Sequence, residues 1–197
     1  TISRLPGALG SRLAQKLAKE LEVDLFDQEI VEQIATSANR SKQIVESLDE
    51  QDRSILNDWI DALGENHMWS YQYLEHLTKV VGAIGAHGYA IIVGRGASYI
   101  LPKEVCLRLL VVAPLEKRIR NVMSQYSVSE QEARRQIIRT DADRKAFIQK
   151  YYQADLTDPM NYDLVINTDS IDLELATRVV KEAFNSRHWY DYTVKVK

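Results

Sequence analysis

A chain of 197 residues with 45% hydrophobic residues is long enough for one large domain with its own core. No apolar run approaches the length of a membrane span, and a net charge of -3 argues against a general nucleic-acid binder. The single cysteine, Cys106, excludes a disulfide within the chain and fits a reducing compartment, so we expect a cytoplasmic protein.

The first predicted element is a strand that runs through a glycine-bearing loop into a helix. Residues 2–4 form the end of the strand, so close to the first residue that we expect a segment or domain upstream. Pro6, Gly7 and Gly10 interrupt regular structure and let the backbone turn closely at the helix entrance. A loop of this kind presents backbone N–H groups at the positive end of a helix, which suits phosphate. One face of the helix is apolar: Leu13, Leu17 and Leu21.

The phosphate-loop pattern in this stretch is incomplete. The standard loop ends in Gly-Lys-Ser or Gly-Lys-Thr, where the lysine reaches the terminal phosphates and the hydroxyl holds magnesium. With Gly10 as the final glycine, Ser11 and Arg12 stand where the lysine and the hydroxyl residue would be. Taken alone, the stretch favours an ordinary strand–turn–helix connection over a phosphate site.

The next part of the chain is predicted to be mainly helical. Residues 23–27 form a short strand that ends in Asp27, and apolar residues at helical spacing predict a helix over 28–38. Residues 41–65 are helical and acidic, and a further helix ends near Gly85. The aromatic residues here favour a packing face over a base-stacking platform: Trp59, Trp69, Tyr71 and Tyr73.

Residues 89–93 and 105–112 are continuous apolar runs, typical of central parallel strands buried on both faces. Cys106 is then a buried strand residue, and Pro114 suits the first turn of the next helix. Farther on, Ser129 opens a long charged helix with a capping box, residues 154–162 form a loop, 164–167 form the last strand, and Asp172 caps a final helix. We interpret several arginines as a solvated helix face: Arg118, Arg120, Arg134 and Arg135.

This alternation of strands and helices predicts an α/β fold with a mainly parallel sheet covered on both faces. Ligands of such sheets bind beyond the carboxyl ends of the strands. The loop at 4–10, Asp27 and Arg95 all fall at such ends. A partly desolvated Arg95 needs a counter-charge, for which Asp27 is the nearest candidate, or a ligand phosphate.

A set of stretches, taken in order, resembles the cytidylate kinase-like family, which is similar to the P-loop nucleoside monophosphate kinases. The stretches are residues 2–4 with the loop that follows, Phe26-Asp27, 92–97, 113–119, 141–144 and 162–168. The resemblance implies a P-loop NTPase-type parallel sheet of about five strands with helices on both faces. It also implies a single domain over residues 1–197, with a helical monophosphate-binding insertion at about 28–86 and a lid at about 129–161.

The resemblance implies an ATP-dependent phosphotransferase that uses Mg²⁺ and acts on a nucleoside monophosphate or another small phosphate acceptor. Asp27 and Arg95 would line the acceptor site, and no protein metal cluster, nucleic-acid partner or membrane partner is implied. Self-association and an upstream domain stay open. The lid would close over the transferring phosphate with Arg139, Asp141, Asp143 and Arg144. The donor's phosphates would be held by Ser3, Arg4, Gly7, Ala8, Gly10, Ser11 and Arg12, where Arg4 or Arg12 replaces the missing lysine.

The departures from the family pattern leave a second hypothesis open. Leu9 stands at the position of the usual second loop glycine, and Gly94-Arg95-Gly96 stands where cytidylate kinases carry Gly-Arg-Asp. Phosphate clamps of the missing kind are worth about 10³-fold or more in rate. The alternative is therefore a catalytically inactive nucleotide-binding regulatory module with a degenerate loop.

Overall fold

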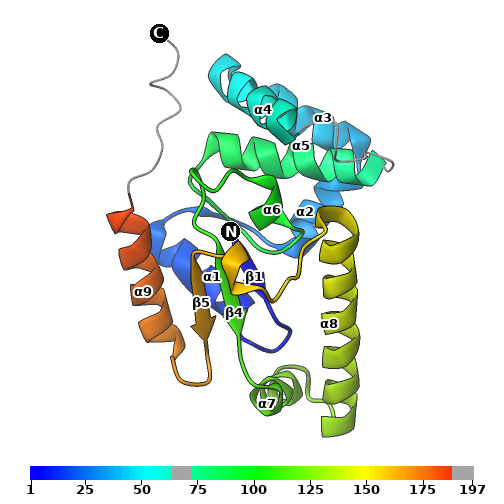
Figure 1. Ribbon diagram of the computed structural model, residues 1–197, viewed down its shortest axis with the longest axis vertical. Helices are drawn as coiled ribbons and strands as arrows, with labels where there is room; N and C mark the ends of the chain where they lie inside the picture. The colour runs from blue at the N-terminus through cyan, green and yellow to red at the C-terminus, as the bar shows by residue number, and fades with distance from the viewer. Residues whose placement is uncertain (64–71, 188–197) are drawn as a thin grey trace.

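A computed structural model of the chain describes residues 1–63 and 72–187. Strands and helices alternate along it, as the sequence predicts (Figure 1). The first half contains β1 (Ile2–Arg4), α1 (Gly10–Leu21), β2 (Asp24–Phe26), α2 (Gln28–Ala35), α3 (Ala38–Ser47), α4 (Glu50–Leu63) and α5 (Gln72–His87). The second half contains β3 (Ala90–Ile92), α6 (Ala97–Ile100), β4 (Leu109–Val112), α7 (Leu115–Tyr126), α8 (Glu130–Tyr152), the 3-10 turn η1 (Pro159–Asn161), β5 (Leu164–Asn167) and α9 (Leu173–Ser186).

The strands pair in parallel but do not form one continuous sheet. A three-stranded sheet has the order β1-β4-β5, and β2 pairs with β3 in a second sheet. The prediction of a single sheet of about five strands is therefore wrong. The two sheets meet at one bridge between Ile2 and Val93. Directly after this bridge Gly94 has a φ of 82°, which is outside the extended region, so the ladder between β1 and β3 ends there.

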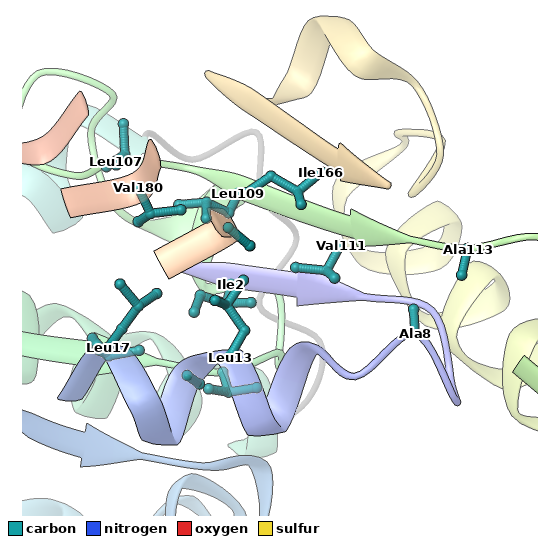
Figure 2. Close-up of a cluster of buried hydrophobic side chains, with 14 residues drawn as sticks. Ile2, Ala8, Leu13, Leu17, Leu107, Leu109, Val111, Ala113, Ile166 and Val180 are labelled. Carbon is teal, nitrogen blue, oxygen red and sulfur yellow. The ribbon is translucent and has the colours of Figure 1, made fainter. Parts of the chain in front are cut away.

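The main core lies between the β1-β4-β5 sheet and helices α1 and α9. Figure 2 shows Ile2 of β1 facing Leu13 and Leu17 of α1, with Leu109 of β4 and Val180 of α9 close by. Leu13 and Leu17 are four residues apart, so they lie on one face of the helix. Burial of one side chain of this size stabilises the fold by roughly 1.5–3 kcal/mol. The predicted apolar face of α1 is confirmed.

The apolar run 105–112 becomes a strand only in its second half. The backbone N–H of Val105 donates to the carbonyl of Pro102 at 3.2 Å, so it turns back instead of joining a ladder. Cys106 is buried, but in the loop before β4, so its prediction as a strand residue is wrong. Burial raises the pKa of its thiol, as expected for an inert core cysteine.

Helices α2, α3 and α4 all pack against α5. This group occupies the part of the chain predicted as the insertion at about 28–86. Trp59 is buried, and Tyr73 packs against the same cluster, so both aromatic residues belong to a packing face as predicted. Trp69 and Tyr71 lie outside the described residues. In the part of the chain that the structure describes, no helix combines the length and apolarity that a membrane crossing requires.

The long helix predicted after Ser129 is α8, which runs along the side of the domain opposite α9 (Figure 1). The Ser129 hydroxyl accepts a hydrogen bond from the backbone N–H of Glu132 at 3.2 Å, and Asp172 caps α9 in the same manner through Leu175. Both helix starts were visible in the sequence because capping depends on residues only three positions apart.

A tyrosine cluster joins α6 to the end of α8 and to the loop before β5. The rings of Tyr99 and Tyr152 stack with centroids 5.2 Å apart, and the Tyr162 hydroxyl donates to the carbonyl of Leu156 at 2.8 Å. Burial is the main cause that raises the pKa of all three phenols. The cluster therefore keeps its protons in the folded protein.

We expect this cluster to make the fold sensitive to alkali. The unfolded chain loses its phenolic protons at about pH 10, whereas the folded chain holds them at higher pH. The contribution of the protonated phenols to the free energy of unfolding is therefore complete below about pH 10. It is lost as the pH rises toward the pKa values of the phenols in the folded protein. Tyrosinate absorbance from the cluster should appear together with the loss of far-ultraviolet circular dichroism. A Tyr89→Phe variant, which lacks the phenolic hydroxyl of a residue that is 87% exposed, marks the contribution of exposed phenols. Full ionisation before unfolding would contradict the expectation.

Candidate functional site

Side chains from distant segments hold the loop between β1 and α1. Asn121 of α7 donates to the carbonyl of Gly7 at 2.8 Å, and the Thr168 hydroxyl donates to the carbonyl of Ala8 at 3.1 Å. Gly7 has a φ of +77°, and a Cβ there would lie 2.6 Å from the carbonyl oxygen of Arg118, so glycine is required. The loop conformation is thus set by packing and not left to a ligand.

Leu9 keeps the backbone conformation of a glycine-bearing loop without being glycine. It is the N-cap of α1 with φ 62° and ψ 14°, and it makes no side-chain cap hydrogen bond. This left-handed region costs an L-residue about 1–2 kcal/mol. The first N–H groups of a helix have no acceptor within the helix. Because Leu9 caps none of them, this positive helix end is available to an anion.

Two adjoining clefts lie at the carboxyl ends of the strands, where the sequence predicts a site. The larger, of about 370 Å³, is formed by the ends of β1 and β3, the start of α2, and α8. The smaller, of about 180 Å³, is formed by the loop before α1 together with α7 and α8. Their common wall consists of Arg4, Thr140 and Arg144.

Arg4 is a largely buried arginine without a carboxylate partner. Its Nη2 donates to Oε1 of Gln28 at 2.9 Å, and its Nε is buried without a hydrogen-bond partner. Among residues 1–63 and 72–187, no acid lies within ion-pair distance of it. Burial, and then Arg144 and Arg95, lower the pKa of Arg4 to about 9, so the guanidinium is still charged at neutral pH.

Arg144 brings a second guanidinium to the common wall from α8. Its Nη1 donates to the carbonyl oxygen of Arg4 at 2.8 Å. Burial is the main cause that lowers the pKa of Arg144, with Asp141 opposing it and Arg95 adding to it. The charge of a guanidinium in such surroundings is stabilised when an anion approaches. The common wall is therefore an electropositive position between the two clefts.

Arg95 lines the larger cleft, and its partner is not the predicted one. Its Nε lies 2.8 Å from Oε2 of Glu32 on α2. Asp27 is instead the N-cap of α2, where Oδ1 accepts from the N–H of Glu29 and of Ile30 at 2.9 Å each. The expectation that Asp27 would neutralise Arg95 is wrong, because Asp27 is used by its own helix while Glu32, one turn further along, faces the arginine. Asp27 lines neither cleft.

Arg118 is buried, so its interpretation as part of a solvated helix face is wrong. Its Nη1 lies 2.8 Å from Oδ2 of Asp141 and also contacts the carbonyl of Pro6. Asp141, predicted as a lid residue at the phosphate, is thus engaged in a pair that fastens α8 to α7, and it lines neither cleft. The pair was hidden in the sequence because its members lie on different helices.

The other predicted lid residues differ in position. Asp143 lines the larger cleft, whereas Arg139 lines neither cleft. The side chain of Arg139 is 86% exposed, and its Nε lies 4.0 Å from Oδ2 of Asp143. Thr140, one residue beyond Arg139, is on the common wall. One residue of helix turns the side chain by about 100°, so α8 presents Arg144 and not Arg139 to the clefts.

The predicted donor residues divide between the two clefts. Ser3 is buried and lines only the larger cleft, and Ala8 lines neither. The remaining members all line the smaller cleft, and Arg4 lines both: Arg4, Gly7, Gly10, Ser11 and Arg12. Sequence reasoning missed several residues, since none carries a motif and only tertiary packing brings them to the site: Gln28, Glu32, Thr140, Phe147, Ile148 and Leu156.

Comparison with known proteins identifies a family. A model of the cytidylate kinase-like family matches residues 1–170. Cytidylate kinases of Staphylothermus marinus and Methanocaldococcus jannaschii are 28% and 29% identical over 48% and 52% of this chain, which correspond to 54% and 60% of their own lengths. A uronate isomerase of Corynebacterium glutamicum is 32% identical over 50% of this chain and 19% of its own. The chain thus spans little more than half the length of the matched cytidylate kinases.

A solved structure supports the fold. An uncharacterized protein from Eubacterium ventriosum superposes with a TM-score of 0.74 at 21% identity, covering 94% of this chain and 97% of that one. The overall fold is therefore shared over almost the full length of both chains.

Proposed function

The chain belongs to the cytidylate kinase-like family, and on that premise we propose that it transfers a phosphoryl group from ATP to a small phosphorylated acceptor. A nucleoside monophosphate is the first candidate acceptor, because cytidylate kinases are among the matched relatives. In this proposal the smaller cleft takes the donor's phosphates and the larger cleft takes the acceptor.

The observation that carries the proposal is the unneutralised positive charge between the clefts. Arg4 and Arg144 both line the common wall, and neither has an ion-pair partner among the described residues. A buried charge without a counter-charge destabilises the unliganded fold. Such a pair is what a phosphoryl-transfer site requires, since it binds phosphate oxygens and offsets the negative charge of the transition state.

The residues present fit the phosphates of a nucleoside triphosphate. The smaller cleft is lined by the N-terminus of α1, by Arg12 and by Arg4. Mg²⁺ usually keeps several waters and binds through one or two carboxylates together with substrate phosphates. Oxygen-bearing side chains on the cleft walls include Asp143, Thr140 and Ser11. No group of three or more His, Cys, Asp or Glu residues suited to a metal occurs in the described ranges.

The acceptor's body would pack on the apolar side chains of the larger cleft. Phe147, Ile148 and Leu156 line that cleft together with the arginines. A cleft that combines guanidinium groups with aromatic and aliphatic side chains suits a phosphomonoester with a flat or apolar body. In this orientation the acceptor phosphate reaches Arg4, Arg95 and Arg144.

A nucleotide panel followed by a turnover assay tests the proposal. Cytidine, uridine and adenosine monophosphates are each titrated with ATP and Mg²⁺, and diphosphate formation is followed by phosphorus NMR. We expect one monophosphate to raise the melting temperature and to give saturable, ATP-dependent diphosphate formation. Binding without turnover would replace the proposal with the inactive regulatory module, and the absence of any nucleotide binding would reject both.

A further inference from the structure

We propose that Glu32 is a positioning residue that orients Arg95 toward the phosphate of the acceptor. The inference rests on the proposed function, because it takes the larger cleft as the acceptor site. It starts from the ion pair in which Nε of Arg95 lies 2.8 Å from Oε2 of Glu32. Arg95 lines the larger cleft, whereas Glu32 does not.

The backbone of Arg95 restricts where its side chain can go. Gly94, Arg95 and Gly96 have φ values of 82°, 53° and 71°, so the arginine lies within a left-handed run. A Cβ on Gly94 would collide with Nη1 of Arg4, which shows how closely this turn approaches the common wall. Non-glycine residues with such dihedrals are found where the surrounding structure holds them and often at ligand sites. The turn therefore delivers Arg95 to the cleft, but does not set its guanidinium orientation.

Glu32 limits that orientation because its charge attracts only one nitrogen. In the described structure Nε of Arg95 makes an ion pair but no hydrogen bond with the carboxylate, and no hydrogen bond involves Nη1 or Nη2 of Arg95. A guanidinium binds phosphate oxygens best through two parallel N–H groups. With Nε held from the side of α2, the two terminal nitrogens remain for an anion in the cleft.

Tyr73 holds the carboxylate in turn. Its hydroxyl donates to the same Oε2 of Glu32 at 2.7 Å. Burial, followed by this hydrogen bond, raises the pKa of Tyr73, so the phenol keeps the proton that it donates. Tyr73 belongs to α5 and Glu32 to α2, so the chain of contacts connects the insertion helices to the cleft. For comparison, removal of such partners from metal-ligating side chains changes metal affinity or activity by about 10- to 100-fold.

Coulomb's law and positioning make opposite predictions for Glu32→Gln. Removal of a negative charge near the cleft makes the potential more positive and, by itself, tightens anion binding. Loss of the ion pair frees the guanidinium to rotate and weakens binding. The amide oxygen of Gln can still accept from Tyr73, so the variant is expected to fold. The sign of the affinity change therefore separates the two effects.

The experiment measures the binding of inorganic phosphate by calorimetry in a double-mutant cycle. The four proteins are the wild type, Glu32→Gln, Arg95→Gln and the double variant. We expect Glu32→Gln to weaken phosphate binding about tenfold in the wild-type background and to have no effect when Arg95 is already Gln. Glu29→Gln, which removes an exposed charge from the same helix, is the matched control and should not weaken binding.

Tighter binding by Glu32→Gln, or an equal loss in both backgrounds, would overturn the inference, as would a wild-type protein that binds no phosphate. Tyr73→Phe provides a second test, with an expected smaller loss that also vanishes without Arg95. Calorimetry needs no turnover, so the two proposals fail separately. If Glu32→Gln weakens phosphate binding only when Arg95 is present, but no diphosphate forms, the kinase activity alone is rejected. If the effects of Glu32→Gln and Arg95→Gln on phosphate binding are additive while turnover is normal, the positioning role alone is rejected.

Discussion

Replacement of Arg4 with methionine is expected to raise the stability of the unliganded protein and to abolish phosphate binding at the common wall. Methionine fills a similar volume without a charge, and the charge it removes has no carboxylate partner among the described residues. Apolar replacement of even paired buried charges is often neutral or stabilising by about 1–4 kcal/mol. Chemical denaturation measures the gain in unfolding free energy, and calorimetry with inorganic phosphate or ATP measures the loss of binding.

Arg118→Met is the matched control, and it is expected to lower the free energy of unfolding. Arg118 is also buried, but its Nη1 lies 2.8 Å from Asp141. Methionine at this position leaves Asp141 without its partner, and breaking a buried pair costs about 3–5 kcal/mol. If Arg4→Met lowered stability as Arg118→Met does, Arg4 would be a structural residue, and the charge between the clefts would no longer support a phosphate site.

Arg144→Ala is expected to lower kcat about 10³-fold, the scale on which an arginine contributes to phosphoryl transfer. Arg144 is on the common wall, where its guanidinium would meet the transferring group. Its one hydrogen bond within the described structure goes to the carbonyl of Arg4. The fold should survive, because no ion pair is broken. Steady-state kinetics and a melting curve on the same preparation report both quantities.

Arg139→Ala is the control on the same helix. Its side chain is 86% exposed, and its contact with Asp143 is a surface pair at 4.0 Å. Such pairs contribute little, so kcat and stability should both stay close to those of the wild type. A large loss of kcat in Arg139→Ala would show that α8 turns during catalysis, and would return Arg139 to the role that the family resemblance implies.

Most of the local structure could be predicted from the sequence. The stripe of Leu13 and Leu17 predicted α1, and Ser129 and Asp172 marked the starts of two later helices. These signals depend on residues within one or two helical turns, so they need no knowledge of the fold. The position of the clefts was also predictable, since Arg4 ends β1 and Arg95 comes shortly after β3, and the carboxyl ends of these strands meet at one edge.

The division of the sheet was not predictable from composition or periodicity. Residues 89–93 and 105–112 both look like central strands, yet the strands cover only 90–92 and 109–112. The left-handed turn at Gly94 ends the pairing of β1 with β3. The N–H of Val105 turns back to Pro102, so the first half of the run 105–112 joins no ladder. Both depend on how loops pack against other segments.

The sequence by itself determined the order of the strands and the longer helices, the apolar face of α1 and the edge of the sheet at which the clefts lie. Only the tertiary structure decided which charges are neutralised. Arg118 has Asp141, Arg95 has Glu32, and Arg4 has no acid among the described residues. The reason is that periodicity and capping act over a few residues, whereas an ion pair acts over a few ångströms between side chains that lie anywhere in the chain.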